Sequence, residues 1–294
     1  MMTPTSEGFV DFNVPAAGKA CKTWYKIFGD LKSGTPLVGL HGGPGSTHHY
    51  ILSLVDLAAS HSISVVLYDQ LGNGNSTHLP EKRGDTAFWT EQLFLDELDN
   101  LLSALGIRDN YALLGHSWGG MLGARHAARQ PTGLRRLVIS DSPADMKLWL
   151  EAANKLLAEL PRETQDTLMK HETAGTTDSQ EYKEAIGVFY ARYLCRVHPM
   201  PSEVSATFEW MEKDPTVYLT MNGPSEFHVI GSLKDWSILD EIHKINVPTL
   251  LLNGAYDEAQ DSTVVPFFKS IPQVKCGESL KCHKILASPP YHDR

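Results

Sequence analysis

Short apolar runs alternate with longer amphipathic segments through the first half of the chain. The runs at residues 36–40 (PLVGL), 64–70 (SVVLYDQ), 111–115 (YALLG) and 134–140 (LRRLVIS) have the length and composition of buried parallel strands. Residues 90–107 instead repeat leucine with helical spacing. This alternation predicts an α/β fold, in which a mostly parallel sheet is flanked by helices through right-handed crossovers.

The alternation stops near Asp141 and resumes at residues 247–254 (VPTLLLNG). Between these points the chain is polar and helical in character, and the segments 147–160 and 181–194 are amphipathic. We therefore expect a group of helices inserted between two strands of the sheet. The predicted domains are an α/β core of residues 1–141 and 241–294 and a helical cap of residues 142–240.

Composition narrows the class of protein. The chain has 294 residues, of which 42% are hydrophobic and 21% charged, which suits one large folded unit. A net charge of −9 argues against nucleic acid and anionic membranes as partners. No apolar run reaches the roughly 20 residues of a membrane span, and the N-terminus has no signal-peptide pattern. We expect a cytoplasmic protein.

The four cysteines are scattered along the chain without a close pair. This spacing suits neither a disulfide scaffold nor a zinc site. The sequence therefore predicts no metal and no other cofactor, and it leaves the oligomeric state open.

The strongest chemical signal is the pentapeptide GHSWG at residues 115–119, directly behind the apolar run 111–115. The pattern G-x-S-x-G between a strand and a helix is the nucleophile elbow of the α/β-hydrolase fold. Its turn is so tight that only glycine or a residue with a small side chain fits beside the nucleophile, which explains Gly115 and Gly119. The motif predicts Ser117 as a catalytic nucleophile.

A second motif, HGGPG at residues 41–45, follows the apolar run 36–40. In this fold the oxyanion hole combines the amide of the residue after the serine, here Trp118, with an amide from an earlier glycine-rich loop. Pro44 has no N–H, so the second donor is Gly42 or Gly43, and we favour Gly43. Both amides would stabilise negative charge on a substrate carbonyl oxygen.

The nucleophile requires a base and an orienting acid, which follow in the chain order Ser, Asp or Glu, His. Asp257 lies just after the apolar run of 247–254, at the strand end where α/β sites form. Of the 13 histidines, only His283 and His292 come after it. For most of the earlier histidines we expect ordinary surface or turn positions.

Taken together, HGGPG, VVLYDQLGNGNS, GHSWGG, MNGPSEF and NGAYDE resemble the proline iminopeptidase family of α/β hydrolases, most closely its fungal members. The resemblance covers residues 7–275. It implies a serine aminopeptidase that removes an N-terminal residue, usually proline, from short peptides or aminoacyl amides. It makes Ser117 the nucleophile and Asp257 the acid, and it assigns the oxyanion hole to the Gly43 and Trp118 amides. It also implies that Glu226 and Glu258 bind the substrate amine.

The chain departs from the family pattern after residues 271–275 (IPQVK), where no apolar strand and no Ser-His turn follow. Family spacing places the base near Lys284, so His283 is the candidate. Three alternatives stay open at this point: an amino-acid amidase or esterase on the same scaffold, a catalytically impaired form that lacks the usual histidine block, and a binding protein without catalysis.

Overall fold

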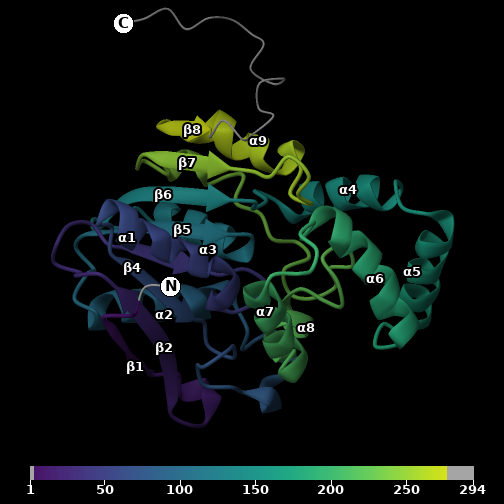
Figure 1. The fold of residues 1–294 in the computed structure, drawn as a ribbon, viewed down its shortest axis with the longest axis horizontal. Helices are drawn as coiled ribbons and strands as arrows, with labels where there is room; N and C mark the ends of the chain where they lie inside the picture. The colour runs from purple at the N-terminus through teal and green to yellow at the C-terminus, as the bar shows by residue number, and fades with distance from the viewer. Residues whose placement is uncertain (1–2, 277–294) are drawn as a thin grey trace, which may run out of the picture.

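The fold is built on one mixed sheet. A computed structural model describes residues 3–276, and their strands join in the order β1-β2-β4-β3-β5-β6-β7-β8 (Figure 1). The strands are β1 Ser6–Phe12, β2 Cys21–Phe28, β3 Leu37–Leu40, β4 Val65–Asp69, β5 Tyr111–His116, β6 Leu134–Ser140, β7 Thr249–Leu252 and β8 Val274–Cys276. β2 is antiparallel to both β1 and β4, and all the other pairs are parallel. The predicted α/β fold with a mostly parallel sheet is confirmed.

The middle of the sheet is buried on both faces, as β4 shows. Val66 and Tyr68 belong to the main hydrophobic core, which also includes apolar residues of α2 and α3. Val65 and Leu67 point the other way, into a smaller cluster with apolar residues of the 3₁₀ helix His48–Val55. Successive side chains of a strand alternate between faces, so a run of apolar residues is required where both faces are covered.

The α-helices of the core are α1 Asp56–His61, α2 Glu91–Ala104, α3 Trp118–Ala128 and α9 Asp261–Ser270. The helix predicted within residues 90–107 is α2. The Thr90 hydroxyl caps α2 by accepting the Leu93 N–H, and Gly106 after the helix has a φ of +68°. The 3₁₀ helix His48–Val55 directly precedes α1.

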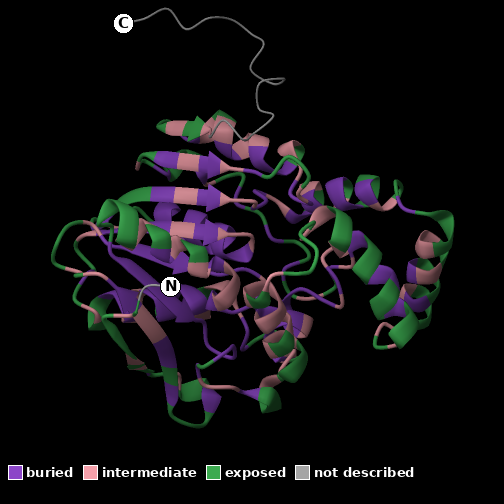
Figure 2. Cartoon of the chain, viewed as in Figure 1, coloured by how far each residue is buried: buried purple, intermediate pink, exposed green. Residues whose placement is uncertain are grey.

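Five α-helices lie between β6 and β7 in the chain. They are α4 Met146–Leu157, α5 Arg162–Ala174, α6 Gln180–Tyr193, α7 Ser202–Lys213 and α8 Thr216–Met221. α4, α5 and α6 extend to one side of the sheet and share a separate hydrophobic cluster, which includes Leu156, Leu168 and Phe189 (Figures 1 and 2). α7 packs against the 3₁₀ helix His48–Val55. We refer to these five helices as the cap helices.

One edge of the sheet was not anticipated. Val274–Cys276 forms β8, which pairs in parallel with β7 from Thr249 to Leu251. The sequence predicts no strand within this segment; the apolar strand that the family pattern leads us to expect, and that the sequence lacks, concerns the residues after 275. None of the helices within residues 3–276 is long and apolar enough to cross a membrane.

Candidate active site

Ser117 occupies a sharp turn between β5 and α3. Its backbone has φ 54° and ψ −123°, a conformation that residues with a side chain rarely adopt. The turn is held by hydrogen bonds from the Ser117 N–H to the Ser140 carbonyl (2.9 Å) and from the Ser142 hydroxyl to the Ser117 carbonyl (2.8 Å). The strained turn presents the serine side chain to a cavity above the sheet.

The two glycines of the elbow are required by the close approach of backbone atoms. A Cβ on Gly115 would lie 2.1 Å from the Gly119 carbonyl oxygen. A Cβ on Gly119 would lie 2.1 Å from the Leu40 carbonyl oxygen, at the end of β3. No side chain fits at such distances, which agrees with the reason that the sequence suggested for both glycines.

The glycine-rich loop after β3 lies beside the serine. A Cβ on Gly42 would be 3.0 Å from the Ser117 Cβ, so this loop and the elbow are in close contact. The Gly42 N–H donates to the Tyr50 hydroxyl at 2.6 Å and is therefore already used. Gly43 has a φ of +106°, and its neighbour Pro44 has no N–H. Of the two donors that the sequence left open, the geometry favours Gly43.

The other predicted oxyanion donor is the amide of Trp118. It is the first residue of α3, and the first N–H groups of a helix have no partner within the helix. Its buried indole N–H donates to the Gln70 side-chain oxygen at 2.9 Å, and the Gln70 side-chain amide donates to the His41 carbonyl at 3.1 Å. These contacts tie the elbow to the start of the glycine-rich loop.

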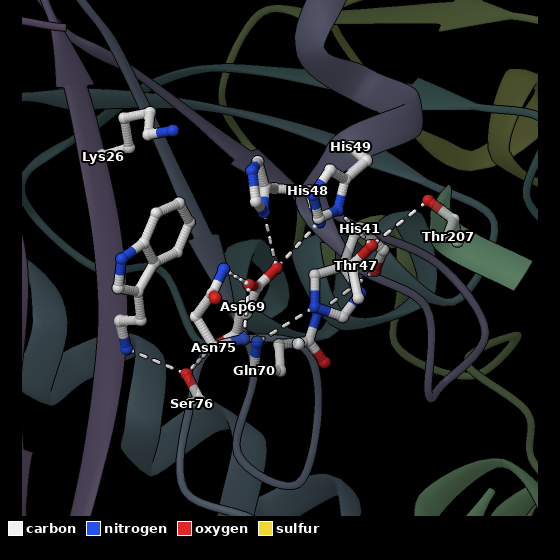
Figure 3. A network of polar contacts seen from close by, with 12 residues as sticks. Lys26, His41, Thr47, His48, His49, Asp69, Gln70, Asn75, Ser76 and Thr207 are labelled. Atoms are coloured by element: carbon white, nitrogen blue, oxygen red, sulfur yellow. Dashed lines mark hydrogen bonds and ion pairs between the residues drawn. The ribbon is translucent and has the colours of Figure 1, made fainter. Parts of the chain in front are cut away.

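A buried carboxylate at the end of β4 organises the same loop (Figure 3). One oxygen of Asp69 accepts the His48 N–H at 2.9 Å and the His48 ring Nδ1 at 2.8 Å. The other oxygen accepts the Asn75 N–H at 2.9 Å and the Asn75 side-chain amide at 3.1 Å. Asp69 thereby joins the loop after β3 to the turn after β4.

The lowered pKa of Asp69 indicates that its carboxyl group is ionised at neutral pH. Burial by itself would raise the pKa of Asp69, but the hydrogen bond and charge of His48 outweigh it and lower the pKa to about 2. His41 and His48 are buried, so our prediction of surface or turn positions is wrong for both. The apolar strand before Asp69 signals a strand end, but nothing in the sequence pairs that aspartate with His48, 21 residues earlier.

Ser117 opens into a cavity of about 190 Å³ between the sheet and the cap helices. Its lining includes apolar side chains of the cap helices and the segments between them, among them Leu194, Val204, Phe208 and Met211. Four acids also line the cavity, and no lysine or arginine does so among the described residues. The acids are Asp141, Glu226, Asp257 and Glu258.

The two glutamates have surroundings suited to a cation. Burial raises the pKa of Glu226 to about 7, and the Tyr218 hydroxyl donates to it at 2.9 Å. Burial and the nearby Glu226 raise the pKa of Glu258 well above its ordinary value. One oxygen of Glu258 is buried without a hydrogen-bond partner among the described residues. A buried acceptor of this kind needs a donor, which a ligand can supply.

Asp257 lies in the loop after β7, as the sequence predicted, and lines the same cavity. One of its oxygens accepts the Ala259 N–H at 2.8 Å. Burial and the charge of Asp141 raise the pKa of Asp257 to about 8. The candidate base His283 lies outside the described residues, as does His292. The structure therefore brings Ser117, Asp257, Glu226 and Glu258 to one cavity, and their roles stay predictions.

The fold and the comparisons agree on the class of protein. The family model for the alpha/beta hydrolase fold matches residues 35–284. A proline iminopeptidase of Saccharolobus solfataricus is 36% identical over 248 residues, which cover 84% of this chain and 78% of that protein. The proline iminopeptidase of Heyndrickxia coagulans is 34% identical, with 92% of this chain and 89% of that protein covered.

Solved structures give the same picture. A proline iminopeptidase of Mycobacterium smegmatis has a TM-score of 0.82 at 45% identity, covering 92% of this chain and 89% of that chain. The crystal structure of VinJ has a TM-score of 0.88 at 53% identity, covering 93% and 90%. This chain is an enzyme of the α/β-hydrolase class. It belongs to the proline iminopeptidase family, as its motifs predicted.

Proposed function

We propose that this chain is a serine aminopeptidase that releases the N-terminal residue, usually proline, from short peptides. The observation that carries this proposal is the composition of the cavity: Ser117 shares it with four acidic side chains, and no lysine or arginine lines it among the described residues. An unmodified peptide has a cationic amine at its N-terminus, so the site favours substrates that place this amine beside the acids. An internal peptide bond has no such charge nearby.

In the proposed reaction, Glu226 and Glu258 hold the substrate amine and so bring the first carbonyl carbon to Ser117. The serine oxygen attacks this carbon while His283 removes the hydroxyl proton, and the Gly43 and Trp118 amides stabilise the resulting oxyanion. Collapse of this intermediate breaks the peptide bond, and the histidine returns the proton to the leaving amine. Asp257 orients the histidine and stabilises its cationic form.

Water then attacks the acyl-enzyme with the histidine as base, and the amino acid leaves with regeneration of the Ser117 hydroxyl. Each cycle consumes one water and needs no external cofactor. Nucleic acid and membrane have no part in this reaction, and we propose a cytoplasmic enzyme acting on small peptides.

The experiment is hydrolysis of proline β-naphthylamide by the full 294-residue chain, with N-acetylproline β-naphthylamide as the matched substrate without a cationic amine. We expect release of naphthylamine from the first substrate only, and its loss by a factor of at least about 10³ in Ser117→Ala. Cleavage of both substrates at similar rates would contradict an aminopeptidase that requires the amine. Activity on the amide but not on a prolyl tripeptide would instead favour an amidase.

The histidine variants test the base separately. His283→Ala should lose activity to the level of Ser117→Ala, whereas His292→Ala, the matched control in the same segment, should retain it. If both histidine variants match the parent, His283 is not the base. If the parent is already as slow as Ser117→Ala, this chain is a catalytically impaired form.

A further inference from the structure

Tyr50 and His116 connect the glycine-rich loop to Asp141, one of the acids that line the cavity. The Tyr50 hydroxyl lies 2.6 Å from the Gly42 nitrogen and 3.0 Å from His116 Nδ1. The amide can only donate, so the hydroxyl oxygen accepts there. Burial raises the pKa of Tyr50 far above its ordinary value, so the phenol keeps its proton and can donate it to Nδ1. The direction of the Gly42 hydrogen bond is therefore fixed, and that of the Tyr50–His116 hydrogen bond depends on which ring nitrogen of His116 carries the proton.

The surroundings of His116 favour one tautomer. Burial lowers the pKa of the ring although the charge of Asp141 opposes this effect, so the ring is neutral and has one N–H. Nε2 lies 3.8 Å from an Asp141 carboxylate oxygen, whereas Nδ1 lies beside the Tyr50 hydroxyl, which can donate. We therefore place the proton on Nε2, where it faces the carboxylate, and assign Nδ1 as the acceptor from Tyr50.

Asp141 in turn holds the loop that follows β7. It accepts the Gly254 N–H at 2.6 Å and the Ser140 hydroxyl at 2.7 Å, and its own N–H donates to the Leu252 carbonyl at 2.9 Å. Its φ of +48° is unusual for a residue with a side chain, so these contacts hold a strained backbone in place. Three residues after Gly254 comes Asp257.

We propose that Tyr50, His116 and Asp141 are positioning residues that form one chain of contacts between the oxyanion loop and the loop carrying Asp257 and Glu258. The chain runs from the Gly42 N–H through the Tyr50 hydroxyl and the His116 ring to Asp141 and the Gly254 N–H. It fixes the distance between the Gly43 amide and the acids of the loop after β7. Its catalytic consequence rests on the proposed aminopeptidase function.

His116 is also unsuited to act as the catalytic base, because Tyr50 occupies one ring nitrogen and Asp141 faces the other. His116 occupies the variable position before the serine in the G-x-S-x-G motif. In this chain we assign that position a positioning role.

The kinetic test uses Tyr50→Phe, Asp141→Asn and the double variant, with Tyr25→Phe on β2 as a control that loses a hydroxyl without breaking the chain. Each of the two single variants should lower kcat on proline β-naphthylamide by about 10- to 100-fold, while KM changes less than about threefold. Both variants break the same chain of contacts. The double variant should therefore lose little more kcat than the more impaired of the two single variants. Losses that multiply, or a change in KM alone, would overturn the proposal.

A second measurement needs no substrate and separates this proposal from the proposed function. Protein labelled with ¹⁵N in its histidine rings should show His116 as the Nε2–H tautomer, assigned by the signal lost in His116→Gln. Tyr50→Phe should shift the His116 Nδ1 resonance, and Tyr25→Phe should leave it in place. If the parent cleaves no substrate but the ring spectrum agrees, only the proposed function fails. An Nδ1–H tautomer would overturn the chain itself, whatever the activity.

Discussion

The backbone N–H and the ring Nδ1 of His48 both lie within 2.9 Å of the same Asp69 oxygen. This pair is buried and joins the glycine-rich loop to the end of β4 (Figure 3). The Cβ that Gly74 lacks would lie 2.3 Å from the other Asp69 oxygen, so the turn after β4 also closes tightly around this carboxylate. Asp69 thus holds the segments after β3 and β4 together, although it does not itself line the cavity.

Asp69→Asn should lower the free energy of unfolding at pH 7 by about 3 kcal/mol, because it removes a buried, hydrogen-bonded carboxylate and leaves acceptors and donors mismatched. The folded-state pKa of Asp69 is about 2, below the ordinary value of 3.8, so its charge stabilises the fold above pH 4. That stabilisation is lost as the pH falls through about 2. Urea unfolding of both proteins at several pH values measures the difference.

The stability difference between parent and Asp69→Asn should shrink by about 2 kcal/mol between pH 5 and pH 2. Asp11→Asn is the matched control, because the Asp11 side chain is 88% exposed. A difference that stays constant with pH would show that packing, not charge, explains the loss. A loss in Asp11→Asn as large as that in Asp69→Asn would contradict a special role for the buried pair.

The raised pKa of Glu226 predicts how substrate binding depends on pH. With a pKa of about 7, this carboxyl is mostly protonated at pH 6 and mostly ionised at pH 8. Only the ionised form attracts a substrate ammonium, so KM for proline β-naphthylamide should fall as the pH rises through 7. Glu226→Gln should raise KM by about tenfold at pH 8 and flatten this pH dependence.

Glu209→Gln on an exposed position of α7 is the control for charge at a distance, and it should leave the KM profile unchanged. If Glu226→Gln keeps the parent profile, another group controls binding of the amine, and Glu258→Gln becomes the variant that decides between the two glutamates.

The glycines of the chain divide into those that the fold requires and those that it tolerates. Gly115→Ala places a Cβ 2.1 Å from the Gly119 carbonyl oxygen, so it should destabilise the protein by about 3 kcal/mol or more and abolish hydrolysis. Gly187→Ala, in the middle of α6, meets no atom within 4 Å and should stabilise the protein by about 0.5 to 1 kcal/mol. Thermal unfolding of both variants checks these values, and similar effects at the two positions would contradict the distinction.

The sequence predicts those parts of the site that depend on local pattern. The elbow around Ser117 is such a part, because one tight turn imposes its glycines, its preceding strand and its following helix within a few residues. The strand before Asp257 is another. The family resemblance brought Glu226 into consideration, but its burial depends on how the cap helices close over the sheet.

Contacts between distant segments could not be predicted in this way. Asp69 meets His48 only because β4 lies beside β3, and Tyr50 meets His116 across 66 residues of chain. From composition and spacing alone, we expected surface or turn positions for most histidines of this kind, and nothing distinguished His48 and His116. The three-residue strand β8 escaped prediction for a different reason. Its conformation depends on hydrogen bonding to β7, and the pattern of its side chains gives little indication of a strand.

The last prediction concerns His78, which joins the turn after β4 to the end of α7. Its Nδ1 lies 2.5 Å from an Asp214 oxygen, and its Nε2 lies 2.8 Å from the Gly74 carbonyl. Both partners only accept hydrogen bonds, so both ring nitrogens must donate and the ring is cationic. The hydrogen bond with Asp214 raises the pKa of His78, although partial burial opposes this effect.

A histidine whose pKa is raised in the folded state stabilises the fold below the unfolded value of about 6.5, and this stabilisation disappears as the pH rises through the folded value. His78→Gln should therefore lower the free energy of unfolding at pH 6 by about 0.5 to 1 kcal/mol, a modest figure because the site is partly exposed to solvent. At pH 9 the parent should lose this advantage over the variant. His61→Gln, on the exposed end of α1, is the control, and a His78→Gln deficit that grows with pH would contradict a cationic ring.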